Sequence, residues 1–321
     1  MTASIPSAPF TWTKQLETAA NLIETLSNPQ QFANKFFPNN CLSQSSIYPQ
    51  WVFRGVGNSN YRLTPTSLRT KTEDSNTYAL LKSYGLKESN CSTKTFDSNN
   101  QKRVELEIIC EFYKRAHRAG LALPRLSYTL HQYLLESNVS ELMHIQHGSM
   151  TWPDHELLPI FGIAQHYGVP TRLLDWSHSP FVAAFFAAQS AAKENKKIET
   201  SKLAVWILNS KFLQHNNASG VPREVLHIIE PPTSDNPNLS LQQGVFTLQS
   251  YENDNQEFDL SKYLIDSLVK YHINLHIPIL LKLELPASQS RDLLQQLSAI
   301  GYSANRIYNG FEGAAKSVWL R

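Results

Sequence analysis

The sequence predicts an α+β fold organised as a single domain, and three observations lead to this class. Several stretches repeat apolar residues at intervals of three and four, which is the period of an amphipathic helix. Other stretches are short apolar runs that end at glycine, proline or a polar residue, as buried strands do. The chain also contains no internal repeat and no linker-like segment between two domains. We therefore expect one domain over residues 14–321, with a flexible N-terminus at 1–13.

The N-terminal half is predicted to be a largely helical portion. Its one expected strand, at 51–54, ends in a polar turn. The stretch 84–102 is rich in Ser, Asn and Lys, which predicts an exposed loop or insertion. Apolar periodicity predicts helices at 14–28, 103–119, 128–135, 139–145 and 157–167.

The C-terminal half is predicted to alternate strands with helices. Ser179 followed by Pro180 is typical of a helix start, and that helix should run to about residue 195. Its alanines, at 183, 184, 187 and 188, should let a neighbouring element approach closely. A loop is expected at 231–240 and a helix at 292–300. The expected strands are 171–176, 202–209, 244–249 and 277–286.

Composition excludes several classes of protein. Of the 321 residues, 41% are hydrophobic and 11% aromatic, which is enough for a large globular core. A net charge of +2 gives no electrostatic basis for binding long tracts of nucleic acid, although it is compatible with a local basic cleft. No apolar run approaches the ~18 residues of a membrane span, and the first residues do not resemble a signal peptide. We expect a cytoplasmic protein without membrane contact.

Cysteine and histidine usage predicts no metal site. The chain has three widely spaced cysteines, which form neither a disulfide framework nor a thiolate metal site. His144 and His147 could share a helix face, but no third ligand lies near them in the sequence, and catalytic zinc needs three. Phosphate-loop, dinucleotide and nucleophile-elbow motifs are absent. Cys110 lies on an apolar helix face and is expected in the core.

Two apolar runs end in an arginine, and both are candidate site positions. In the first, Arg54 and Gly55 follow "WVF", so a rigid guanidinium fork stands at a strand end beside a residue that allows close backbone approach. The second is "TRLLDW", where Arg172 and Asp175 flank a short strand, and Asp175 lies just ahead of a helix N-terminus. Either arginine could instead belong to a buried structural ion network.

A third candidate lies in "SLQQGVFTLQ". Gln242 and Gln243 precede Gly244 at a predicted strand start, and a glutamine side chain offers both a donor and an acceptor without charge. Such a group could orient an amide or a ribose hydroxyl. An edge-strand turn with no ligand remains the alternative.

These motifs, taken together and in this order, resemble the FRG domain family, which is named for its Phe-Arg-Gly signature. The signature stands intact at Phe53-Arg54-Gly55, followed by "QHYGVPTRLLDWSHSPFVAAFFA" and "QQGVFTL". The ending "LLQQLSAIGYSANRIYNGFEGAAKSV" also resembles that family, and Glu312-Gly313 is similar to its acidic-Gly pair. The family occurs in bacterial and phage proteins, some of them in defence contexts.

A further likeness is to ADP-ribosyltransferases, in the order of three motifs: Arg54-Gly55, then Asp175 to Ser177 with the alanine-rich helix, then Gln243. It implies a small mixed or antiparallel sheet split around a cleft, flanked by helices, with NAD as substrate. Arg54 would contact the NAD pyrophosphate or ribose, Gly55 the nicotinamide amide and Gln243 the ribose hydroxyls.

Within the same likeness, the catalytic group would comprise Arg54, Arg172, Asp175 and Gln243. The remaining nucleotide contacts would come from Gly55, Thr171, Ser177, Gln242 and Gly244. The departure from the pattern is that no glutamate occupies the third motif.

Three functions remain open from the sequence. The first is an enzyme, acting as a defence or toxin effector, that cleaves NAD and transfers ADP-ribose to a macromolecular acceptor or to water. The second is a module that binds a nucleotide, a nucleic-acid end or a peptide carboxylate without reaction. In the third, the arginines are buried network residues and exposed loops contact a partner protein.

Overall fold

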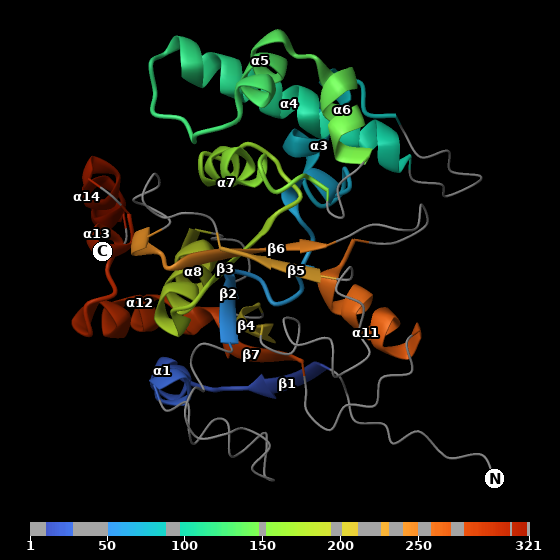
Figure 1. The fold of residues 1–321 in the computed structure, drawn as a ribbon. Coiled ribbons are helices and arrows are strands. Elements are labelled where there is room, and N and C mark those ends of the chain that lie inside the picture. Colours follow the sequence, from blue (N-terminus) through green and yellow to red (C-terminus); the bar gives the residue numbers. More distant parts are fainter. Residues whose placement is uncertain are drawn as a thin grey trace, which may run out of the picture.

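A computed structural model describes residues 11–27, 51–87, 97–147, 152–193, 201–210, 226–230, 240–249, 258–270, 279–308 and 310–319. Within these residues the fold is α+β, as expected, and it is built on one open mixed sheet (Figure 1). The strand order is β1-β7-β4-β2-β3-β6-β5. The pairing of β1 with β7 is parallel, and the other pairings are antiparallel. The strands are β1 (Thr11–Gln15), β2 (Trp51–Val56), β3 (Leu174–Ser177), β4 (Lys202–Asn209), β5 (Leu226–Ile229), β6 (Gly244–Gln249) and β7 (Leu280–Pro286).

The helices gather in separate groups around this sheet (Figure 1). A helical cluster lies above the sheet: α3 (Ser75–Ser83), α4 (Ser98–Arg118), α5 (Tyr128–Glu136), α6 (Val139–His147) and α7 (Leu158–His166). The other helices are α1 (Ala19–Ser27), α8 (Pro180–Lys193), α11 (Leu260–Lys270), α12 (Ser290–Ala299), α13 (Ala304–Ile307) and α14 (Gly310–Trp319). Two single 3₁₀ turns complete the described elements: Thr66–Leu68 and Ala287–Gln289.

Three apolar clusters hold the layers together. One joins α1, α8 and α12 to strands β2, β4 and β7. A second lies on strands β2, β3, β4, β6 and β7 and includes Leu260 and Leu264 of α11. The third is the core of the helical cluster, which reaches the sheet through Phe246 and Leu248 of β6. No helix within the described segments combines the length and the apolar character needed to cross a bilayer.

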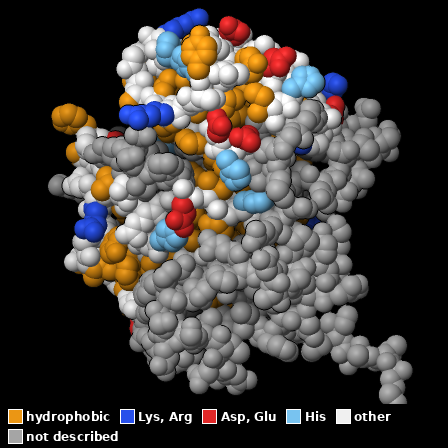
Figure 2. Space-filling model, viewed as in Figure 1, with side chains coloured by type: hydrophobic (Ala, Val, Ile, Leu, Met, Phe, Trp, Pro, Cys, Tyr) orange, Lys and Arg blue, Asp and Glu red, His pale blue; other side chains and the backbone are white. Residues whose placement is uncertain are grey.

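The helical cluster is not a terminal portion, as the sequence suggested, but an insertion between β2 and β3. It lies at the top of Figure 1, with α7 between the sheet and the other helices. On the described part of the face in Figure 2, cations and anions are interspersed over this cluster and form no single-sign patch.

Several element boundaries differ from the sequence expectations. The stretch 11–13, expected to be flexible, belongs to β1, which pairs with β7 along the edge of the sheet. Residues 98–102, expected in an exposed loop, form the first turns of α4, where the Asp97 side chain accepts the Asn100 N–H at 2.9 Å. The loops expected at 88–96 and 231–239 lie outside the described residues.

Other expectations are confirmed. Helices α5, α6 and α7 lie where apolar periodicity placed them, and α8 begins at Pro180, as the helix-start signal predicted. Gly168, with φ at 82°, follows α7 in the left-handed conformation expected of a residue that ends a helix. Strands β2, β4, β6 and β7 also match their predicted positions to within a few residues. Strand β5 and helices α3, α11, α13 and α14 were not predicted.

Candidate functional site

The candidate site is a pocket of about 730 Å³ where the sheet divides between β2 and β3. Strand β2 pairs with β4 from Trp51 to Val56, and β3 pairs with β6 along its whole length. In contrast, β2 and β3 share a single residue pair, Phe53 with Ser177. The two halves of the sheet therefore separate beyond that pair, and both strand ends supply lining residues.

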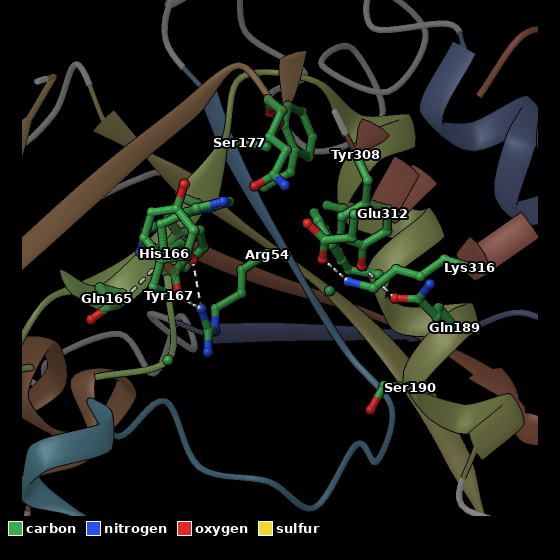
Figure 3. A pocket seen from close by; sticks show the side chains of 18 of the residues that line it. Arg54, Gln165, His166, Tyr167, Ser177, Gln189, Ser190, Tyr308, Glu312 and Lys316 are labelled. Carbon is green, nitrogen blue, oxygen red and sulfur yellow. Dashed lines mark hydrogen bonds and ion pairs between the residues drawn. The ribbon is translucent and has the colours of Figure 1, made fainter. Parts of the chain in front are cut away.

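Figure 3 shows how the side chains of the pocket lie. Arg54 projects into its centre, between two walls. One wall carries Gln165, His166 and Tyr167 from the end of α7 and the residue after it. The opposite wall carries Gln189 and Ser190 of α8 and, from the C-terminal segment, Tyr308, Glu312 and Lys316. Helix α8 also contributes Phe186 and Lys193 to the lining.

Arg54 is held by the backbone and the side chain of Asp175. Its Nη1 donates to the Asp175 carbonyl oxygen at 2.7 Å and lies 3.5 Å from Asp175 Oδ2. Burial lowers the pKa of Arg54, while the carboxylate of Asp175 counteracts part of this effect. An arginine stays protonated under these conditions, so a permanent cation faces the pocket. The Arg54 Nε is buried and has no hydrogen-bond partner among the described residues.

Asp175 is held in turn by two successive hydrogen bonds on the α7 side, from Thr171 to Gln165 and from Gln165 to Asp175. Gln165 Nε2 donates to Asp175 Oδ1 at 2.8 Å and to the Leu173 carbonyl at 3.0 Å. Thr171 Oγ1 donates to Gln165 Oε1, and this bond sets which end of the amide faces Asp175. Thr171 is fully buried and does not line the pocket, so the structure places it behind the site.

Arg172 does not join Arg54. Its Nε donates to Glu105 Oε2 at 2.6 Å, and both side chains are buried. Glu105 also accepts hydrogen bonds from Ser67, Gln101 and Trp152. The structure thus places Arg172 in a buried network that joins α4 to the segment before β3, outside the pocket lining. The expectation that both arginines face one cleft is wrong.

Gln242 and Gln243 lie in different environments, the first at the pocket and the second exposed to solvent. Gln242 lines the pocket, accepts from Ser177 Oγ at its carbonyl (2.7 Å) and donates from Nε2 to the Ile307 carbonyl at 3.4 Å. Gln243 is exposed, has a left-handed backbone (φ 47°) and accepts from the His178 N–H, so it does not line the site. Gly244 begins β6 opposite Ser177 in the ladder and is likewise outside the lining.

The structure gives Gly55 a packing role in addition to the ligand contact expected of it. It lines the pocket, but its missing side chain is required by α8, whose backbone crosses directly over β2. A Cβ on Gly55 would overlap the Ala183 carbonyl oxygen and lie 2.7 Å from the Ala187 nitrogen. The alanines of α8 permit this approach, as the sequence indicated, and the element that approaches is β2.

The C-terminal segment supplies a group of lining residues that sequence reasoning did not select. Tyr308 donates from its hydroxyl to Gln189 Oε1 at 2.6 Å, and burial raises the pKa of Tyr308 to about 12. Gln189 Nε2 is buried and has no hydrogen-bond partner within the described segments. Lys316 Nζ lies 3.5 Å from the centre of the Tyr308 ring and donates to Glu312 Oε1 at 2.5 Å. Glu312 and Lys316 are four residues apart, a spacing typical of one helix face, but nothing in the sequence places that face at the pocket.

His166 is the titratable group on the opposite wall. Burial lowers the pKa of His166, and the negative charges of Glu312 and Asp175 counteract part of that effect. The imidazole is therefore neutral near pH 7 and can accept or donate a proton at the pocket. In the described residues, no group of three or more His, Cys, Asp or Glu side chains is arranged to hold a metal ion.

The lowered pKa of His166 predicts a pH dependence of stability. As the pH falls, the unfolded chain takes up this proton first, so the contribution of neutral His166 is present above about pH 6.5 and lost as the pH falls through the folded pKa. The free energy of unfolding of wild type should therefore drop more between about pH 7.5 and pH 5.5 than that of His166→Gln, measured in urea. Equal drops in the two proteins would contradict this assignment.

Comparison with known proteins agrees with the motif order. No curated protein and no solved structure matches the chain. Residues 49–196 match the family model of the FRG domain. The matched region runs from just before β2 to just past α8, and so includes Arg54, Gly55, Asp175 and Ser177 of the pocket. The chain therefore carries an FRG domain over residues 49–196.

Proposed function

We propose that the pocket binds NAD and breaks its nicotinamide–ribose bond, in the manner of an ADP-ribosyltransferase or an NAD glycohydrolase. The observation that carries the proposal is the placement of Arg54 at the fork between β2 and β3, in a pocket that also holds carboxylates. This placement agrees with the motif order that prompted the likeness to ADP-ribosyltransferases.

The side chains of the pocket suit the parts of a dinucleotide. Its volume of about 730 Å³ falls within the usual range of small-molecule sites. Arg54 and Lys193 supply positive charge for a diphosphate. Tyr167 is 70% exposed at the edge of the pocket, so its ring is available for stacking against a base. Gln242 supplies the uncharged polar contact that the sequence had assigned to Gln243.

Replacing Arg54 with alanine should abolish NAD binding or weaken it by at least tenfold, because the central cation of the pocket is lost. The purified protein is incubated with NAD, free nicotinamide is followed by chromatography, and binding is followed by calorimetry. Arg291→Ala, an exposed arginine of α12 that does not line the pocket, is the matched control and should behave as wild type. Absence of both nicotinamide release and NAD-dependent heat in wild type would refute the proposal.

The same variant tests a role as a toxic effector. If the protein consumes NAD in cells, expression should slow growth and lower the cellular NAD content, and Arg54→Ala should relieve both effects. Growth inhibition that persists in Arg54→Ala would separate toxicity from the pocket.

A second candidate function is binding of a nucleotide without reaction. This function is favoured by the contacts of Asp175. Its carboxylate already accepts a hydrogen bond from Gln165 and forms an ion pair with Arg54. A carboxylate neutralised in this way contributes less to stabilising a cationic sugar. Recovery of unaltered NAD after prolonged incubation, together with measurable binding, would favour this function.

A further inference from the structure

Among the described residues that line the pocket, two are carboxylates, and they come from different walls. Asp175 lies on β3, on the side of Gln165 and the end of α7. Glu312 lies on α14, on the side of Tyr308 and Lys316 (Figure 3). The third motif of the ADP-ribosyltransferase pattern carries Gln243 here and no glutamate. A carboxylate that stabilises a developing positive charge on the ribose would therefore have to be Asp175 or Glu312.

The Asp175 carboxylate is paired with Arg54. Its Oδ1 accepts from Gln165 at 2.8 Å, and the orientation of that amide is set by Thr171. Its Oδ2 lies 3.5 Å from the Arg54 guanidinium. Although 57% of its side chain is exposed, the charge of Asp175 is paired with a permanent cation that points into the same space.

The Glu312 carboxylate is paired with a lysine and not with an arginine. Its side chain is 49% exposed, and its hydrogen bond within the described residues comes from the lysine one turn away, Lys316, at 2.5 Å. Lysine is a flexible point charge that can give way to a cation on a ligand. The negative charge of Glu312 also acts on the groups around it, because it opposes the fall in the pKa of His166 and adds to the rise in the pKa of Tyr308. Glu312 lines the pocket from the C-terminal wall (Figure 3).

The helix that carries Glu312 packs closely against α13 and the backbone of Tyr308. Gly313 lets α14 approach so closely that a Cβ there would lie 2.6 Å from the Tyr308 carbonyl oxygen. Ser317 Oγ donates to Asn305 Oδ1 at 2.9 Å, which ties α14 to α13. Tyr308 is in turn anchored to Gln189 of α8. A carboxylate on such a support keeps its position, as electrostatic stabilisation of a transition state requires.

We propose that Glu312 is the catalytic carboxylate of this pocket, a proposal that rests on the proposed function. In the reaction, the bond between ribose C1′ and the nicotinamide nitrogen breaks, and its electron pair leaves with neutral nicotinamide. The remaining oxocarbenium ion is stabilised by the negative charge of Glu312. Water then forms the new C1′–O bond and loses a proton to solvent, which gives ADP-ribose, nicotinamide and one proton.

Glu312→Gln tests the assignment. This variant keeps the size and shape of the side chain, removes its charge and replaces one of its two acceptor oxygens with a donor NH₂ group. We expect nicotinamide release to fall by about 10²–10³-fold in kcat, while calorimetric affinity for ADP-ribose, the probe used, changes by less than about threefold. Asp175→Asn should show the opposite split, with weaker ADP-ribose binding and a smaller loss in kcat. Glu24→Gln, an exposed carboxylate of α1 outside the pocket, is the matched control and should behave as wild type.

The variant leaves Lys316 without its charged partner, and a second variant separates this effect. In the double variant Glu312→Gln with Lys316→Met, activity should stay low if the carboxylate itself is required. Recovery of activity there would overturn the proposal, as would a folded Glu312→Gln protein with wild-type kcat. If wild type releases no nicotinamide at all, the proposed function fails instead, so the two failures are distinguishable.

Discussion

Gly55→Ala is expected to destabilise the protein by about 3 kcal/mol or more, at or beyond the upper end of the usual cost of overpacking a core. The added methyl group would overlap the carbonyl oxygen of Ala183 and press on the Ala187 nitrogen. Both atoms belong to the backbone of α8, so no side-chain rotation can relieve the contact. Urea unfolding followed by circular dichroism would measure the loss.

Two controls separate this cause from others. Gly301→Ala, where nothing lies within 4 Å of the added Cβ but φ is 91°, should show only the smaller conformational cost of about 1–2 kcal/mol. Adding Ala183→Gly should not restore the stability of Gly55→Ala, because the added methyl group overlaps the backbone carbonyl oxygen of Ala183 and not its side chain. A Gly55→Ala protein as stable as wild type would show that α8 does not cross β2 as closely as described.

Arg172→Met should cost about 3–5 kcal/mol of stability, since it leaves Glu105 as a buried charge without its cation. The side chains of Arg172 and Glu105 are 1% and 0% exposed, so water cannot replace the lost partner. The expected result is a large fall in the urea midpoint. The proposed binding of NAD should be the same in the fraction that remains folded as in wild type, because Arg172 is outside the pocket lining.

The double variant Arg172→Met with Glu105→Leu checks this reasoning. If the penalty comes from the unpaired carboxylate, removing Glu105 as well should restore part of the stability, and the two changes should be strongly non-additive. Additive losses would mean that the two side chains act independently. By contrast, Arg54→Ala should change stability less, because the Arg54 side chain is 17% exposed and its ion-pair partner Asp175 is largely accessible.

The fold class and most of the strands and helices could be predicted from the sequence. The spacing of apolar residues and the residue types at helix and strand ends are local features of the chain. They predicted β2, β4, α7 and α8 to within a few residues. Strand β1 was missed because it is a short edge strand of mixed polarity, and what makes it a strand is its pairing with β7, far away in the chain.

The two arginines show why the site could be predicted only in part. Arg54 and Arg172 each occur in a short apolar segment, and the sequence offers no means of telling them apart. The difference lies in Glu105, which is 67 residues from Arg172 in the chain but 2.6 Å from it in space. Likewise, Gln242 rather than Gln243 reaches the pocket because the left-handed turn at Gln243 directs that residue outward. The place of Glu312 and Tyr308 follows from how α14 packs, which no local pattern encodes.

The order of strands in the sheet has a consequence for the boundaries of the unit that folds. In the described part of the region 49–196, which matches the family model, two strands of the sheet occur, β2 and β3, and they share a single residue pair. The long ladder of β2 is formed with β4, which lies beyond residue 196. Excised alone, the matched region would leave both strands with open edges prone to aggregation. The segment that matches the family model is thus shorter than the sheet to which it belongs, and a transplant of this domain into another protein would have to include β4 and β6, which pair with β2 and β3.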